Sequence, residues 1–239
     1  MIGLAEVVVA STIEAIGAIV QGSLGFGLNV VAAPLLLLVD PRFVPVPTLL
    51  AGVLTTFAVA MRDRANVDRV GITWALGGRV VGTVGGAVAL LILARRPMGV
   101  LFGSLVLIAV LLSLLGWNIK RVPGTLVGVG VLSGFMATTA SIGGPPMALV
   151  YQHEQGSTIR GTMATYGFVG TVMSVATLAI FGEISAAEIS LTLALLPGLG
   201  VGFIASRSGV RFLDKGWMRP AVVVLCSASA MAVLLRSAL

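Results

Sequence analysis

The chain has 239 residues, of which 57% are hydrophobic and only 10% are charged, and its mean hydropathy is +1.09. This composition indicates an all-α polytopic membrane protein and excludes a soluble globular domain. The formal net charge is +6, but the basic residues lie in short segments between apolar stretches. There they set membrane topology, so the charge gives no reason to expect nucleic acid as a partner.

The first apolar region covers residues 1–39 and is interrupted by three glycines: Gly22, Gly25 and Gly27. Glycine weakens helical order, and residues 28–39 are too short for a crossing, which needs about 20 helical residues. We therefore expect a broken helical hairpin in which a second helix starts near Leu28. Polar side chains surround the interruption: Gln21, Ser23 and Asn29.

Three apolar stretches follow, each long enough to cross a bilayer: about 43–61, 70–94 and 98–116. Within the second of them, Arg79 lies nine residues after Val70, roughly 14 Å into the span. An arginine near the bilayer centre is costly and marks a functional candidate. Three roles stay open: Arg79 binds an anion, it pairs with the equally deep Glu14, or Glu14 carries a proton that couples transport.

The second half of the chain repeats this pattern 116 residues later. At that offset Gly27 aligns with Gly143 and Gly82 with Gly198. Residues 124–152 are then the second broken hairpin, with a helix that restarts near Pro146. The expected spans after it are about 161–181, 186–206 and 220–237. The polar and helix-breaking residues of this second interruption are Thr138, Thr139, Ser141, Gly143, Gly144 and Pro145.

The charges of two equivalent loops differ between the halves. The first loop carries Arg62, Arg64 and Arg69, whereas its counterpart, Gly182–Glu188, carries acidic residues. Positive loops stay in the cytoplasm, so the two halves are predicted as inverted repeats, 1–117 and 118–239. Each repeat would consist of one broken hairpin and three transmembrane helices. Arg160 would then lie on the cytoplasmic side, as a candidate gate residue.

Interrupted segments paired between two halves of a membrane protein are typical of transporter substrate sites. The helices that restart after the breaks have unpaired N–H groups and a positive dipole end, which suit an anion. We predict an anion site near the midplane, where the two breaks converge. Its candidate residues are Gln21, Ser23, Gly25, Gly27, Asn29, Arg79, Thr138, Thr139, Ser141, Gly143, Gly144 and Pro145. The pairs Gly82/Gly86 and Gly198/Gly202 are instead expected to pack helices.

These motifs resemble the TauE/SafE family of sulfite exporters, also called the four-toluene sulfonate uptake family. The matching residues are Gly25, Gly27 and Pro34, then Ser133–Gly134 and the run Ile142-Gly143-Gly144-Pro145-Pro146. The first motif departs from the family pattern, since Leu28 and Asn29 follow Gly27. The resemblance implies a multi-pass permease of the prokaryotic plasma membrane for sulfite, organosulfonates or related sulfur-containing anions.

Two alternatives remain. Helix ends recognise negative charge without identifying sulfur, so the cargo could be another anion such as a carboxylate; the chain could also be a non-transporting membrane partner. We expect no enzyme, because the sequence offers a lone histidine, His153, and no plausible catalytic dyad. We also expect no metal and no cofactor. Direction, coupling ion and oligomeric state do not follow from the sequence.

Overall fold

The computed structural model describes residues 3–93, 100–108, 111, 119–154 and 156–213, with side chains described up to Ser206. Within these ranges the chain is helical and has no strand. The helices are α1 (Leu4–Leu24), α2 (Leu28–Val39), the 3-10 helix η1 (Pro41–Phe43), α3 (Val46–Arg62), α4 (Arg69–Ile92), α6 (Pro123–Ala140), α7 (Gly144–Tyr151), α8 (Gly156–Ile180) and α9 (Ala186–Leu213). Residues 100–108 are also helical. Five of the described helices are long and apolar enough to cross a membrane: α1, α4, α6, α8 and α9. The chain is therefore a polytopic all-α membrane protein.

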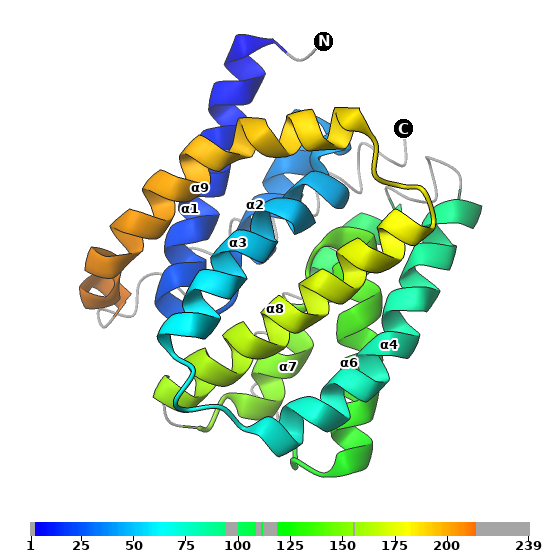
Figure 1. The fold of residues 1–239 in the computed structure, drawn as a ribbon, viewed down its shortest axis with the longest axis vertical. Helices are drawn as coiled ribbons and strands as arrows, with labels where there is room; N and C mark the ends of the chain where they lie inside the picture. Colours follow the sequence, from blue (N-terminus) through cyan, green and yellow to red (C-terminus); the bar gives the residue numbers. More distant parts are fainter. Residues whose placement is uncertain (1–2, 94–99, 109–110, 112–118, 155, 214–239) are drawn as a thin grey trace.

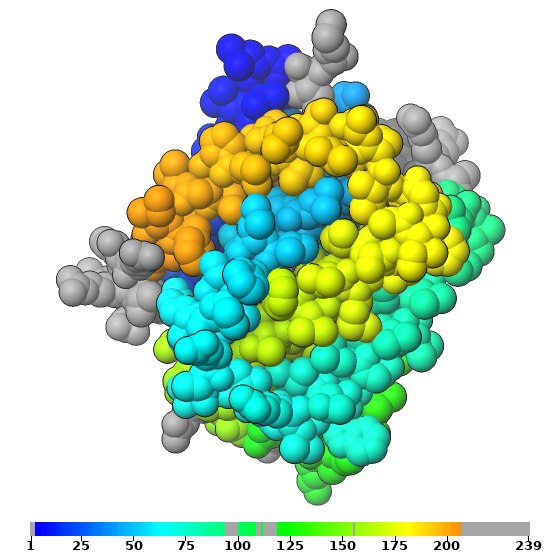
Figure 2. Space-filling view, in the orientation of Figure 1, coloured from blue at the N-terminus to red at the C-terminus, as the bar shows by residue number. Residues whose placement is uncertain are grey.

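The helices form a central pair flanked by two lateral pairs (Figure 1). α3 and α8 pack against each other in the centre, α1 packs on α9 at one side, and α4 packs on α6 at the other. On the face shown in Figure 2, α3 lies between α9 and α8. The start of α8 meets the end of α3, since a Cβ at Gly161 would lie 2.5 Å from the carbonyl oxygen of Asp63. The central pair is thus antiparallel.

Glycines bring the lateral helices close together. In α4, a Cβ at Gly82 would overlap the carbonyl oxygen of Val131 in α6, and one at Gly86 would lie 3.0 Å from the carbonyl oxygen of Phe135. In α9, Gly198 and Gly202 approach the backbone of α1 in the same way. The expected packing role of these four glycines is confirmed. Small residues allow this contact because membrane helices associate by close van der Waals packing.

The two hairpins have arms of unequal length. The first arms are α1 with 21 residues and α6 with 18. Both are long enough to cross a bilayer, so they differ from the arms of a hairpin that enters the membrane and returns without crossing it. The second arms, α2 with 12 residues and α7 with 8, reach only about 18 and 12 Å at 1.5 Å per residue. The predicted span at 43–61 is also shorter: α3 starts at Val46 and has 17 residues, because Pro41–Phe43 form a separate 3-10 turn.

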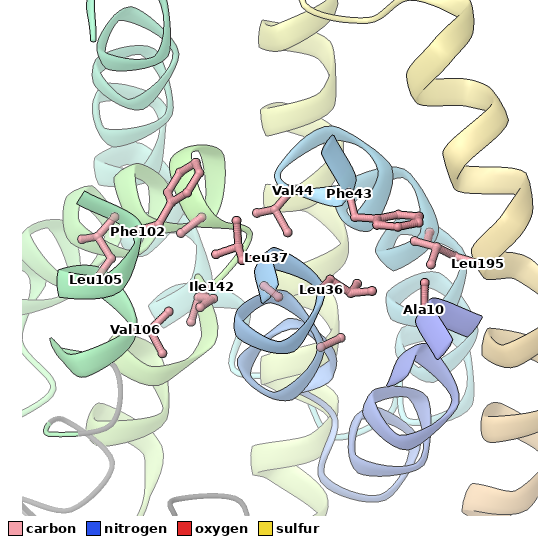
Figure 3. Packing of buried hydrophobic residues seen from close by; sticks show 14 of the residues in the cluster. Ala10, Leu36, Leu37, Phe43, Val44, Phe102, Leu105, Val106, Ile142 and Leu195 are labelled. Carbon is pink, nitrogen blue, oxygen red and sulfur yellow. The ribbon is translucent and has the colours of Figure 1, made fainter. Parts of the chain in front are cut away.

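A hydrophobic cluster surrounds α2 (Figure 3). Leu36 and Leu37 of α2 meet Leu195 of α9 on one side and Phe102 and Val106 on the other. All five side chains are at most 7% exposed. The short second arm of the first hairpin is therefore enclosed by protein, which is where interrupted backbone is tolerated at membrane depth.

Two sets of bonds that join helices differ in character. In the first set Asp68 caps the start of α4, accepts a hydrogen bond from the Tyr151 hydroxyl at 2.8 Å, and lies 3.5 Å from Arg121. Arg121 in turn pairs with Glu154. In the second set the Ser141 hydroxyl donates to the carbonyl oxygen of Pro45 at 3.0 Å and lies 2.9 Å from the Thr48 hydroxyl. The first set includes ion pairs and the second is neutral.

Three sequence predictions lie partly or wholly outside the described residues. These are the span at 98–116, of which 100–108 and 111 are helical, the span at 220–237, and the repeat boundary near 117. The predicted repeats stay a proposal.

Candidate functional site

The first break is a tight turn built on glycine. Gly25 and Gly27 have φ values of 85° and 109°, a left-handed region that glycine adopts without steric cost. Gln21 spans the turn: its Nε2 donates to the carbonyl oxygen of Gly25 at 3.2 Å, and its Oε1 accepts from the Leu28 N–H at 3.1 Å. The amide of one side chain therefore fixes the end of α1 relative to the start of α2.

The second break uses different residues and shares with the first a left-handed residue directly after the first helix. Ser141, with φ of 62°, occupies the left-handed position that follows α6. The Ser133 hydroxyl donates to the carbonyl oxygen of Gly143 at 2.5 Å. α7 starts at Gly144, two residues before the expected Pro146, because prolines fit the first turn of a helix, where no N–H partner is needed.

The two breaks meet. Phe26 of the first lies against Gly144 of the second, where a Cβ would lie 2.9 Å from the ring. Beside this contact is a small cavity of about 60 Å³, measured as the volume open to the centre of a water molecule. Polar and charged side chains that line it are Gln21, Asn29, Thr56, Arg79, Ser141, Tyr166 and Thr171, together with Gly25, Gly27, Gly143 and Gly144 of the breaks.

Arg79 is the charged residue of this cavity. It lies in the middle of α4 and is 2% exposed. Its Nη1 donates to the Ser133 hydroxyl at 3.3 Å, and its guanidinium carbon lies 4.8 Å from the centre of the Tyr166 ring. Its Nε has no hydrogen-bond partner among the described residues. No ion pair of Arg79 is found in the described part of the chain, so a buried positive charge borders the cavity without a counter-charge.

α8 contributes site residues that the sequence did not identify, among them Tyr166 and Gly170. Tyr166 lines the cavity and is 1% exposed. Gly170 makes room for Arg79, since a Cβ there would lie 2.6 Å from Arg79 Cδ and closer still to Nε and Cζ. The available signal was a set of small and polar residues at helical spacing, Gly167, Gly170, Thr171 and Ser174. That spacing is the same as for a helix-packing face, so it could not single out the site.

Eight of the predicted site residues line the cavity: Gln21, Gly25, Gly27, Asn29, Arg79, Ser141, Gly143 and Gly144. Four others are buried beside it with local roles. Ser23 and Thr139 donate to carbonyl oxygens one turn earlier in their own helices, and Thr138 bonds the Ser174 hydroxyl. Pro145 is buried in the first turn of α7.

Glu14 and Arg160 lie outside this cavity. Glu14 is fully buried, and neither of its carboxyl oxygens has a hydrogen-bond partner among the described residues. The pairing of Glu14 with Arg79 is therefore absent from this conformation. Arg160 stands near the start of α8, with its backbone against Gly25 and its Nε 3.8 Å from Asp63.

The helix starts offer fewer donors than the sequence suggested. The Leu28 N–H of α2 is already bonded to Gln21. In α7, the second and third residues are Pro145 and Pro146, which have no N–H. The positive charge of the cavity therefore comes from Arg79 more than from the helix ends.

Residues 11–233 match the family described as sulfite exporter TauE/SafE. The chain belongs to the TauE/SafE family. The resemblance seen in the broken segments is thus confirmed over nearly the whole sequence. Membership of TauE/SafE, with the apolar helices, makes the chain a multi-pass membrane protein with a transport role for sulfur-containing anions. No curated protein and no solved structure matches the chain.

Proposed function

We propose that this TauE/SafE protein is a secondary transporter of sulfite in the prokaryotic plasma membrane, and that the anion binds in the cavity between the two breaks. The observation that carries the proposal is the buried guanidinium of Arg79, which borders the cavity and has no ion-pair partner among the described residues. An isolated buried charge is costly. A bound anion would supply the missing partner.

The size of the cavity supports a small cargo. One water molecule needs roughly 10–15 Å³ on this measure, so about 60 Å³ accommodates a few waters or one small oxyanion. Sulfite fits this volume in the present conformation. An aromatic sulfonate would require the cavity to enlarge.

The arrangement of the helices supports alternating access by two inverted repeats. The ends of α1 and α6 are 116 residues apart, and so are the starts of α2 and α7. Gly25 contacts the backbone of Arg160. At the 116-residue offset Gly25 corresponds to Ser141, whose hydroxyl donates to the carbonyl oxygen of Pro45. Pro45 in turn lies one residue after the position that corresponds to Arg160. Contacts that recur between exchanged halves are expected for a two-fold pseudosymmetry, with the substrate between the repeats.

Flux of radiolabelled sulfite into proteoliposomes tests this function. Arg79→Gln should weaken sulfite binding by roughly 10- to 100-fold, since a hydrogen bond to a charged group is worth about 1.5–3 kcal/mol. Arg69→Gln is the matched control, because Arg69 starts the same helix and is exposed. Folded wild-type protein that carries no sulfur oxyanion, or an Arg79→Gln variant with unchanged affinity, would refute the proposal.

Other anions are distinguished in the same assay. Acetate competing as well as sulfite would favour a carboxylate transporter. A membrane partner without transport would show neither flux nor anion binding.

A further inference from the structure

Six of the seven polar or charged side chains of the cavity fall into two groups, and Thr171 is the seventh. Three of them already make hydrogen bonds to the protein. Gln21 donates one N–H to Gly25 and accepts from Leu28. The Thr56 hydroxyl donates to the carbonyl oxygen of Gly52 at 2.7 Å, and the Ser141 hydroxyl donates to that of Pro45. The two hydroxyl protons are therefore already used, and Gln21 keeps one N–H.

The second group consists of Arg79, Tyr166 and Asn29. Each has a buried polar atom without a hydrogen-bond partner among the described residues: Arg79 Nε, Tyr166 Oη and Asn29 Oδ1. All three residues line the cavity. The guanidinium only donates, the phenol donates or accepts, and the amide oxygen only accepts. A ligand that satisfies this set must combine negative charge with a donor of its own.

The orientation of the Asn29 amide is fixed by its neighbour. Its Nδ2 donates to the carbonyl oxygen of Thr48 at 3.3 Å. A carbonyl oxygen cannot donate, so rotation of the amide would place two acceptors against each other. The free atom of Asn29 is therefore its oxygen.

We propose that the cavity selects a monoanion that carries its own hydrogen-bond donor, which in the sulfite series is hydrogensulfite. This inference rests on the proposed function. Arg79 would neutralise the single negative charge, and the protonated oxygen of the anion would donate to Asn29 Oδ1. Tyr166 would donate to another oxygen of the anion.

The charge of the cavity argues against the sulfite dianion and sulfate. Arg79 is the one charged residue among those that line it, and Tyr166 is the other titratable one. A second negative charge would have no counter-charge, and an unprotonated oxygen would face the Asn29 oxygen. Methanesulfonate matches the charge but has no donor, so it would leave Asn29 Oδ1 unsatisfied. An unsatisfied buried acceptor costs about 1–3 kcal/mol, which corresponds to a preference of roughly tenfold for hydrogensulfite.

Calorimetric titration of the full chain in nanodiscs tests the inference with wild-type protein alone. Hydrogensulfite loses its proton near neutral pH, so the apparent affinity for total sulfite should fall as pH rises through that ionisation. The affinity for methanesulfonate, which does not titrate there, should stay constant and be roughly tenfold weaker. Sulfate should bind more weakly than either.

Two variants make the test specific to Asn29. Asn29→Leu should remove the preference, so that hydrogensulfite and methanesulfonate bind with about equal affinity. Thr83→Val is the control, because Thr83 is also buried with an unpartnered hydroxyl but does not line the cavity; it should keep the wild-type preference. If Asn29→Leu fails to fold, the comparison of anions on wild-type protein still decides.

Each result has one meaning. Equal affinity for methanesulfonate and hydrogensulfite, or sulfite affinity that rises with pH, would overturn the inference while sulfite transport stands. Absence of binding by every anion would overturn the proposed function itself. Bicarbonate is a donor-bearing monoanion without sulfur, so tighter binding of bicarbonate than of hydrogensulfite would support the donor requirement and overturn sulfite as the cargo.

Discussion

Gly170→Ala tests whether the position of the Arg79 guanidinium matters for anion binding. The new methyl group would lie 2.6 Å from Arg79 Cδ and nearer to Nε and Cζ, whereas ordinary contact begins at 3.4 Å. The arginine must therefore move by more than an ångström, which breaks its stacking on Tyr166. Because a hydrogen bond to a charged group is worth about 1.5–3 kcal/mol, we expect sulfite affinity to fall roughly tenfold or more. Overpacking should also lower the free energy of unfolding by about 1–3 kcal/mol.

The assay is the rise in melting temperature with sulfite concentration, measured with proteoliposome flux. A ligand that binds the folded state raises the melting temperature according to its dissociation constant, so binding and stability are read together. Gly77→Ala is the control: it gains the same helix propensity, about 1 kcal/mol, and its Cβ would meet nothing within 4 Å. Gly170→Ala protein that binds sulfite as tightly as wild type would refute the role of Arg79 deduced from this geometry.

Three further predictions concern the helix break, the packing and the coupling. Gln21→Leu removes two hydrogen bonds across the first break, so the free energy of unfolding should fall by about 2 kcal/mol, seen as a melting temperature lower by several degrees. Gly198→Val should prevent folding or destabilise the protein severely, because the side chain would overlap the backbone of Ser11, whereas Gly200→Val, with open space around it, should leave the melting temperature nearly unchanged. Glu14→Gln should abolish stimulation of sulfite flux by a pH gradient and preserve sulfite binding at fixed pH, if Glu14 carries the coupled proton; stimulation equal to wild type would contradict that role.

The breaks could be located from the sequence because their causes are local. Gly25 and Gly27 adopt left-handed backbone that few other residues tolerate, and the start of α2 at Leu28 follows directly. The depth of Arg79 in its span could also be predicted from the sequence, because the rise per residue of a helix is constant. These are properties of single segments.

The partners of Arg79 could not be predicted, because they depend on which helix faces which. Tyr166 and Gly170 lie on α8, more than 80 residues away in sequence. Gln21 was identified as a polar residue at the site, but its use as a brace between Gly25 and Leu28 emerges only once both hydrogen bonds are seen. Likewise, nothing in the sequence distinguishes a Glu14 that pairs with Arg79 from one that is buried apart from it.

Salt should act differently on the two sets of bonds that join helices around Asp68 and around Ser141. Asp68, Arg121 and Glu154 have side chains between 26% and 38% exposed, so ions in the surrounding water screen their attraction, over about 10 Å at 0.1 M ionic strength. The bonds of Ser141 to Thr48 and Pro45 are neutral and buried, and salt leaves them unchanged. Raising the ionic strength would therefore weaken the attraction of Arg121 for Asp68 and Glu154 and leave the bonds of Ser141 in place.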